Sequence, residues 1–85
     1  MTVRQKMQID FEYETVLDAK IRRLIQAGCA VAAGCPTCLS NAFAGAKEAG
    51  ATTAEIKEAL SVGIMVSAGR ARNFALDFLE EVGLK

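Results

Sequence analysis

The stretch LIQAGCAVAAGCPTCLSNAFAGA, residues 24–46, carries no charged side chain and decides the fold. About 20 consecutive apolar residues form a helix that can cross a bilayer, but polar side chains and the central Gly34-Cys35-Pro36 sequence interrupt this stretch. Gly34 can end a helix in a left-handed conformation, and Pro36 suits the first position of the next helix. The stretch therefore predicts two helices that are buried in protein, joined by a tight turn with Cys35 as the N-cap, and no membrane span.

Upstream of this turn, apolar residues at helical spacing predict a helix that ends at Ala33. Thr15 or Asp18 can cap its beginning, because both side chains accept hydrogen bonds from free backbone N–H groups. The apolar stripe of this helix consists of Leu17, Ile21, Leu24, Ile25, Gly28 and Ala32.

The amino-terminal residues leave two interpretations open. Ile9, Phe11 and Tyr13 alternate with polar residues, which is typical of a strand with one apolar face. Glu12 and Glu14 fit the first turn of a helix equally well, since acidic side chains are favoured at that end.

Downstream of the turn, the second helix is expected to stop at Gly50, because glycine favours the position just after a helix. Thr52 and Glu55 have the spacing of a capping box, which opens a third helix. This third helix is expected to end near Gly69. The residues expected on its inner side are Ile56, Ala59, Leu60, Gly63 and Val66.

The last segment shows apolar residues at heptad-like spacing and is ended by Gly83, so it can pack against another helix or another subunit. Its stripe consists of Ala71, Phe74, Ala75, Phe78, Leu79 and Val82. No internal repeat, low-complexity tract or Pro- or Ser-rich linker divides the chain. We therefore predict an all-α fold of about four helices that forms one domain over residues 1–85.

The core that 85 residues can build is small. Hydrophobic residues make up 52% of the chain, but 15 of these 44 are alanine and only 26 are large core-forming side chains. A compact monomer of this size exposes about 4,900 Å² and rarely gains more than about 3–5 kcal/mol from its own core. We therefore expect a homo-oligomer, assembled as a helical bundle, in which other subunits supply the missing burial.

Charge and composition exclude several classes of function. Ten basic and ten acidic side chains cancel, and no basic block is longer than Arg22-Arg23, so nucleic-acid binding is not expected. The amino end lacks the apolar region of a secretory signal, which favours a cytoplasmic protein whose thiols are kept reduced. The chain has no histidine, which excludes a Ser-His-Asp triad, a Cys-His dyad and a His-ligated metal within one chain. No cofactor is expected.

Cys35-Pro36-Thr37-Cys38 is the feature that points to a chemistry, since C-x-x-C in a cytosolic chain is typical of dithiol–disulfide exchange. A helix N-terminus offers unpaired N–H groups and about half a positive charge, and both stabilise a thiolate. Lowering a thiol pKa from about 8.5 to about 7 raises the thiolate fraction at pH 7 about fifteenfold. The alternative is that both cysteines are small apolar fillers of a buried turn.

Cys29 lies in mid-helix, six residues before Cys35, and is expected to be a buried structural residue. Together with Cys35 and Cys38 it would provide three thiolates, whereas a structural zinc site needs four protein ligands. A metal is therefore not expected, unless two subunits share a cluster.

The runs LIQAGCAVAAGCPTC, residues 24–38, and AKEAGATTAEIKEAL, residues 46–60, resemble the alkylhydroperoxidase D-like, or carboxymuconolactone decarboxylase, family. The resemblance covers about residues 17–69. This family is all-helical and forms trimers or hexamers, so the resemblance implies a trimeric or hexameric homo-oligomer. It also implies peroxide-reducing or thiol–disulfide activity, with Cys38 as the peroxide-reactive thiol and Cys35 as its resolving partner.

Two positions depart from the family's pattern. Its peroxidases relay a proton through a histidine four residues after the second cysteine and a glutamate twelve residues before the first. Here these positions hold Ala42 and Arg23, neither of which can accept a proton, and lactone decarboxylation is not expected without histidine. Arg23 is a candidate catalytic residue, since a cation within about 4–6 Å lowers an acid's pKa by about 1–3 units. Otherwise Arg22 and Arg23 form a solvated or intersubunit face.

The sequence thus predicts a thiol–disulfide oxidoreductase or weak peroxidase with Cys35, Cys38 and Arg23 in its site. Its substrate would be a small-molecule peroxide or a protein disulfide. Helix geometry alone favours Cys35 as the nucleophile, so the order of the two thiols stays open. A non-catalytic oligomeric interaction module that kept the fold and lost the relay fits as well, and its thiols would have pKa values near 8.5.

Overall fold

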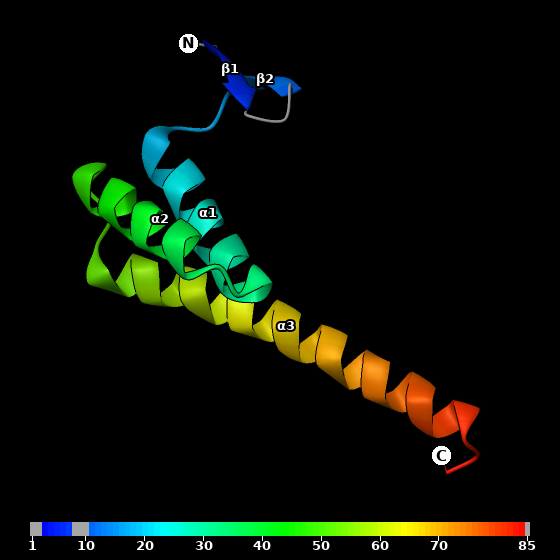
Figure 1. The fold of residues 1–85 in the computed structure, drawn as a ribbon. Coiled ribbons are helices and arrows are strands. Elements are labelled where there is room, and N and C mark those ends of the chain that lie inside the picture. Colours follow the sequence, from blue (N-terminus) through cyan, green and yellow to red (C-terminus); the bar gives the residue numbers. More distant parts are fainter. Residues whose placement is uncertain (1–2, 8–10, 85) are drawn as a thin grey trace.

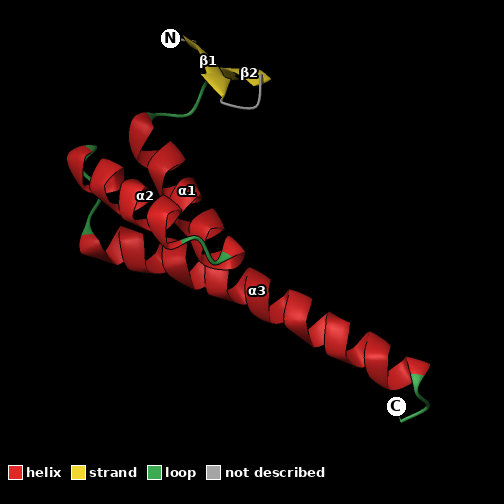
Figure 2. Ribbon diagram, viewed as in Figure 1, coloured by secondary structure: helices red, strands yellow, loops and turns green. Residues whose placement is uncertain are grey.

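The computed structural model describes residues 3–7 and 11–84, which form a β-hairpin followed by three helices (Figure 1). The all-α prediction is confirmed, because the strands found in these residues belong to the hairpin alone and the rest is helical (Figure 2). The elements are β1 (Val3–Met7), β2 (Phe11–Thr15), α1 (Ala19–Ala33), α2 (Pro36–Glu48) and α3 (Thr53–Glu81).

The helices begin where side chains cap their free N–H groups. Asp18, not Thr15, is the N-cap of α1, and its carboxylate accepts a hydrogen bond of 2.8 Å from the N–H of Ile21. The capping box predicted at the start of α3 is confirmed. In it, the Glu55 N–H donates to the Thr52 hydroxyl at 3.0 Å, and the Thr52 N–H donates to the Glu55 carboxylate at 2.9 Å.

The helix expected to end near Gly69 continues to Glu81, so the predicted third and fourth helices are one helix of 29 residues. A single glycine inside a helix costs only about 1 kcal/mol relative to alanine. The residues that follow it, Arg70, Ala71 and Arg72, are good helix formers. The described residues therefore form three helices, where the sequence predicted about four.

The amino-terminal residues form an antiparallel hairpin, in which Val3 pairs with Thr15. The strand interpretation is confirmed for Phe11 and Tyr13, which both lie in β2, and the helical-turn interpretation is wrong. Ile9 lies outside the described residues. The hairpin packs little against the helices, so the site described below depends on α1, α2 and α3.

The helices pack through small side chains. α1 contacts both α2 and α3, and Gly28 meets Gly63 where α1 crosses α3. A Cβ atom on Gly63 would overlap the carbonyl oxygen of Gly28, so this close approach requires glycine. No large side chain among the described residues is less than 2% exposed. The buried apolar residues are Ala27, Ala30, Ala42, Ala46, Ala51 and Ile56.

An ion pair ties the beginning of α1 to the beginning of α3. Lys20 Nζ lies 3.1 Å from Glu55 Oε2, and both side chains are partly exposed. The hydrogen bond from the Thr52 N–H, and then the Lys20 ammonium, hold the pKa of Glu55 below its usual value. The capping box and the ion pair therefore share one carboxylate.

The molecule is elongated. Its radius of gyration is 16.5 Å, against about 12 Å for a compact chain of this length. Its surface is 6578 Å², about 1,700 Å² more than a compact monomer of its mass exposes. The predicted inner side of α3 is right for Ile56 and Gly63 but wrong for Val66, which is 59% exposed. No helix in residues 3–7 and 11–84 has an apolar run long enough to span a membrane.

Candidate functional site

The turn between α1 and α2 is fixed by backbone hydrogen bonds. Gly34 adopts the predicted left-handed conformation (φ 69°, ψ 40°). Its N–H donates to the Val31 carbonyl at 3.2 Å, and the N–H of Cys35 donates to the Ala30 carbonyl at 3.0 Å. Pro36 then occupies the first turn of α2, as predicted. The turn therefore holds Cys35 at the N-cap of α2.

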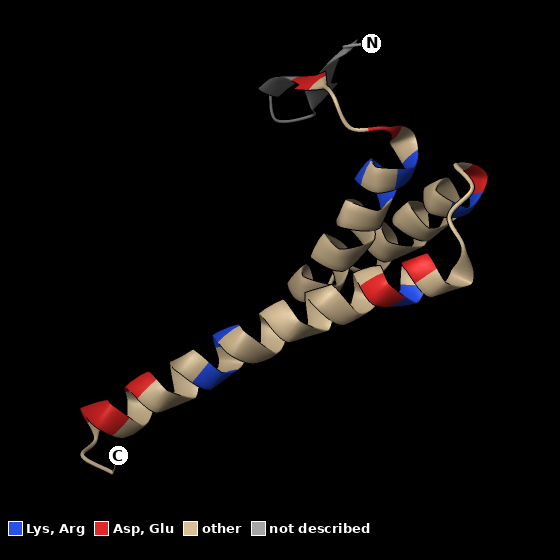
Figure 3. Ribbon diagram, turned by 180° about the vertical axis from the view of Figure 1, so that it is seen from behind, with Lys and Arg blue, Asp and Glu red and all other residues tan. Residues whose placement is uncertain are grey.

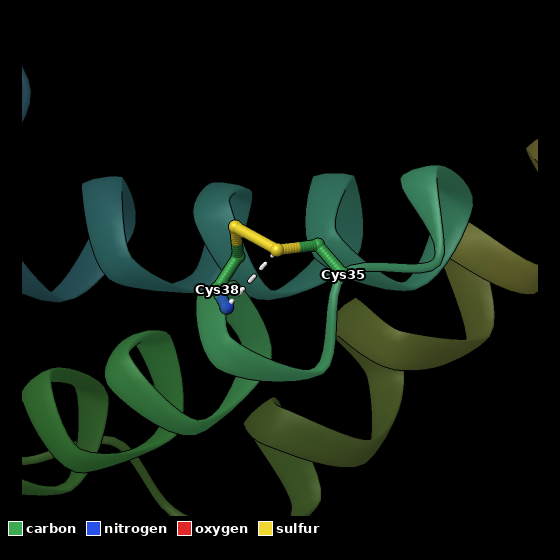
Figure 4. Close-up of a disulfide and its surroundings, with 2 residues drawn as sticks. All are labelled: Cys35 and Cys38. Atoms are coloured by element: carbon green, nitrogen blue, oxygen red, sulfur yellow. Dashed lines mark hydrogen bonds between the residues drawn. A yellow bond between two sulfur atoms is a disulfide. The ribbon is translucent and has the colours of Figure 1, made fainter.

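Cys35 and Cys38 form a disulfide at this N-terminus (Figure 4). Their Cα atoms are 5.3 Å apart, one helical turn from each other. The N–H of Cys38 donates to Cys35 Sγ at 3.2 Å, so the sulfur takes the place of the oxygen of an ordinary N-cap side chain. The two sulfurs are bonded while α2 is helical from Pro36 onward, with Cys38 in its first turn.

The surroundings of the pair favour a thiolate in the reduced state. The first turn of α2 holds no acidic side chain that would oppose a negative charge. One free N–H of the helix end, that of Cys38, donates to Cys35 Sγ, and a sulfur that accepts such a hydrogen bond is stabilised as an anion.

Small molecules can reach the pair from solvent. Cys38 is exposed and Cys35 is half-buried. The interpretation of both cysteines as fillers of a buried turn is therefore wrong for this chain. Access and a polarised helix end are what dithiol chemistry requires.

The side chain of Arg23, in α1, lies beside Gly45 of α2 and away from the two sulfurs. Its side chain covers Gly45, where a Cβ atom would overlap the Arg23 side chain, and its Nη1 donates to Gln26 Oε1 at 3.0 Å. Gly45 is seven residues from Cys38, which corresponds to about 10 Å along the helix. The effect of Arg23 on the thiols stays a prediction.

Ala42, one turn after Cys38, is fully buried in α2. Its side chain is a methyl group, so this position contributes packing and no proton acceptor. With Arg23 at the other relay position, the described residues provide no general base at the sulfurs.

Cys29 is the clearest error of the sequence prediction, because it is exposed and not buried. It lines an apolar groove of about 350 Å³ between α1 and α3, on the side of α1 that α2 leaves uncovered. The groove itself was missed. Its signal in the sequence is the apolar stripe of α1, which extends around more of the helix than α2 can cover.

Metal ligands do not gather in the part of the chain that the structure describes: no three Cys, Asp or Glu side chains lie where they could hold an ion. Among the described residues, the groups that can carry chemistry at the α2 N-terminus are thus the two sulfurs and the Cys38 N–H that donates to one of them.

The structure combines a helical fold with a solvent-accessible cysteine pair at a helix N-terminus. The chain belongs to the carboxymuconolactone decarboxylase family, whose model matches residues 3–81. The resemblance noted in the sequence is thereby confirmed, and this family includes alkylhydroperoxidase D-like peroxidases. Neither any curated protein nor any solved structure matches the chain significantly.

Proposed function

We propose that the chain is a thiol–disulfide oxidoreductase or weak peroxidase whose reactive groups are Cys35 and Cys38. The observation that carries this proposal is the Cys35–Cys38 disulfide at the N-cap of α2, next to solvent. Its substrate would be a small-molecule peroxide or a protein disulfide. We place this chemistry in the cytoplasm, where cellular dithiols can return the electrons.

With a peroxide, the reaction starts from the reduced pair. One thiolate attacks an oxygen of the peroxide ROOH, an S–O bond forms as the O–O bond breaks, and the leaving alkoxide takes a proton to become ROH. The second thiol then attacks the resulting sulfenic acid, so that the S–S bond forms and water leaves. The two thiols give up two electrons, and an external dithiol must reduce the disulfide to close the cycle.

With a protein disulfide, the same thiolate attacks one sulfur of the substrate and the second thiol resolves the mixed disulfide. This exchange depends on thiolate fraction and leaving-group pKa more than on a general base. A positioned acid or base contributes about 10²–10⁴-fold in catalysis, whereas the helix terminus recovers about fifteenfold in thiolate population. The missing base at Ala42 therefore favours exchange over peroxide reduction.

Arg23 enters this proposal as a distant positive charge. At roughly 10 Å in water, two unit charges interact by only about 0.4 kcal/mol, which corresponds to about 0.3 pKa unit. Its contribution to thiolate formation is therefore small beside that of the helix terminus.

The order of the two thiols can be tested by trapping. The hydrogen bond to its sulfur favours Cys35 as the thiolate, whereas the family resemblance assigns peroxide attack to Cys38. Mass spectrometry after peroxide treatment separates these assignments in the Cys35→Ser and Cys38→Ser variants. Sulfenic acid at Cys38 in Cys35→Ser supports the family order, and sulfenic acid only at Cys35 in Cys38→Ser reverses it.

Alkylation tests the proposal as a whole. In a Cys29→Ser chain reduced with dithiothreitol, iodoacetamide should react at pH 6.5 several-fold faster than with an ordinary thiol, because the helix end lowers the pKa. The Cys35→Ser/Cys38→Ser chain, which keeps Cys29, is the matched control for background reaction. Ordinary rates, together with failure to form a linkage that dithiothreitol reverses, would contradict the redox proposal.

The second candidate is a non-catalytic oligomeric interaction module, which the lack of a base at both relay positions favours. It predicts thiol pKa values near 8.5, so the same alkylation experiment decides between the two. In either case we propose a homo-oligomer, and the family resemblance suggests a trimer or a hexamer.

A further inference from the structure

The second half of α3 extends beyond the rest of the molecule (Figure 1). We call residues 70–84 the arm. α3 is about 43 Å long and α1 about 22 Å, so α1 can accompany only half of it. Near the end of α1, the Ala32 carbonyl accepts hydrogen bonds from the Ser67 hydroxyl at 3.4 Å and from Arg70 Nη2 at 3.3 Å. Beyond this point no described element packs on the arm.

The arm carries an apolar stripe that nothing in the described chain covers. Phe74 is 77% exposed and Phe78 is 55% exposed. An isolated helix of this length is marginal in water, because most helical stability comes from packing of an apolar face. The stripe consists of Ala71, Phe74, Ala75, Phe78 and Val82, at the i, i+3, i+4, i+7, i+11 spacing of a packed helix.

The groove between α1 and α3 is equally uncovered and purely apolar. Its volume is about 350 Å³. The residues that matter below are Leu24, Ile25 and Cys29 from α1, and Val62, Gly63 and Val66 from α3. Val62 and Val66 are 48% and 59% exposed, although both lie in the uncharged middle of the helix.

The arm of the same chain cannot enter this groove. It continues α3 in a straight line, away from α1, in both views of the fold (Figure 1 and Figure 3). A second copy can supply an arm of matching chemistry. The excess surface of about 1,700 Å² per chain exceeds the roughly 800 Å² per partner that a stable interface buries, so one such contact, or two, fits within it.

We propose that the arm of one copy lies in the α1–α3 groove of a second copy, with the Phe74–Phe78 stripe against Cys29, Val62 and Val66. This contact covers the two uncovered apolar surfaces with one another. It also accounts for the exposure of Cys29, which the neighbouring arm covers in the assembly.

Charge favours one direction of the arm in the groove. Basic side chains lie at the beginning of α1, and acidic ones at the tip of α3 (Figure 3). Arg70 and Arg72, at the beginning of the arm, lie between this acidic tip and the uncharged middle of α3. Asp77, Glu80 and Glu81 carry the acidic charge of the tip. Near the beginning of α1, Arg22 Nε is buried and has no hydrogen-bond partner among the described residues. If the arm of one copy runs antiparallel to α1 of the other copy, its acidic tip lies beside the basic beginning of that α1.

The two surfaces lie on different sides of α3. If the groove side of α3 is continued from Val62 and Val66 at helical spacing, it reaches Asn73, Asp77 and Glu80, which are polar. In a dimer with a two-fold axis, the α3 helices of the two copies would lie side by side and would contact each other through the same side. If that side is the groove side, the contact would bury these polar residues. The apolar stripe enters the groove only in a head-to-tail contact, and such a contact joins three or more chains, as a closed ring or as an open filament.

Disulfide trapping with Cys29 tests the contact directly. In a Cys35→Ser/Cys38→Ser background, Ala75→Cys places a thiol in the middle of the arm stripe, and Asn73→Cys places one on its polar side as the matched control. Mild oxidation should link Ala75→Cys chains into a ladder that reaches three or more chain masses on a non-reducing gel. The Asn73→Cys chain should show at least tenfold less linkage.

Four results would overturn the proposal. Equal linkage in both variants, or none in either, removes the contact, and a ladder that stops at two chain masses removes the head-to-tail arrangement. Light scattering on the unmodified protein is the second measurement, and a monomer at micromolar concentration would also exclude the contact. Since the trapping background lacks Cys35 and Cys38, these outcomes leave the redox proposal unaffected.

Discussion

The turn at residues 34–38 and the arm at residues 70–84 show two ways in which this chain determines its structure. In the turn, every feature is set by neighbours in sequence: Gly34 ends one helix, Pro36 begins the next, and Cys35 caps it. In the arm, the helix is specified but its apolar face has no partner in the chain. Local chemistry therefore builds the sulfur site, whereas no described part of the chain buries the apolar face of the arm.

The largest effect should come from charging the arm. Phe74→Glu/Phe78→Glu removes two side chains whose burial is worth about 1.5–3 kcal/mol each, so association should weaken at least about 100-fold. Sedimentation equilibrium measures this change. Asn73→Glu, on the polar side of the same helical turn, is the control and should assemble normally. Unchanged association of the double variant would show that the arm is not held by a second copy.

Alanine substitutions at two glycines of α3 compare the half of the helix that packs on α1 with the residues just before the arm. Gly63→Ala should lower the free energy of unfolding by about 1–3 kcal/mol, because its Cβ would overlap the Gly28 carbonyl oxygen and force the helices apart. Gly69→Ala should raise it by up to about 1 kcal/mol, since nothing lies within 4 Å of a Cβ there. Urea denaturation checks both values, and equal effects would contradict the close contact of α1 with α3.

The capping box at the start of α3 should make stability depend on pH. The pKa of Glu55 is lowered in the folded chain, by the Thr52 N–H first and by Lys20 next. Its ionised form therefore stabilises the fold above the usual carboxylate pKa of 4.5, and this contribution is lost as the pH falls through the lower folded value.

Glu55→Gln should remove this part of the pH dependence and lower the Tm slightly at pH 7. Thermal unfolding of both proteins between pH 7 and pH 3 measures the difference. Parallel curves over this range would mean that Glu55 has the same pKa in the folded and unfolded states.

The smallest effect is expected from substitution of Arg23. This variant shows whether its charge acts on the thiol pKa values by direct contact or only from a distance. Arg23→Ala should change the Cys35 and Cys38 pKa values by less than about half a unit, because its guanidinium lies beside Gly45, roughly 10 Å from the sulfurs. Thiol titration by absorbance at 240 nm provides the values. A rise of a full unit or more would place Arg23 among the catalytic residues, as the sequence suggested.

Sequence predicted the turn well and the outer surfaces poorly, for a physical reason. The conformations of Gly34 and Pro36 follow from their own backbone chemistry, so the position of Cys35 could be read without knowing the tertiary structure. The expected break at Gly69 failed because one glycine costs too little to stop a long helix.

Cys29 and Val66 were expected inside, and both are exposed in the single chain. Helical periodicity shows that a side chain lies on an apolar face, but not which molecule covers that face. Arg23 was placed near the sulfurs by its position relative to the family's relay. Its contact with Gly45 depends on how α1 crosses α2, which spacing along the chain does not reveal.

The reduction potential of the Cys35–Cys38 pair tests the central claim most directly. Equilibration of the Cys29→Ser protein with glutathione buffers, followed by mass spectrometry of the trapped thiols, gives this value. A catalytic dithiol should show a potential between about −270 and −120 mV, the range of the thioredoxin-like oxidoreductases. A potential below about −300 mV, typical of structural disulfides, or a pair that never links would contradict the account.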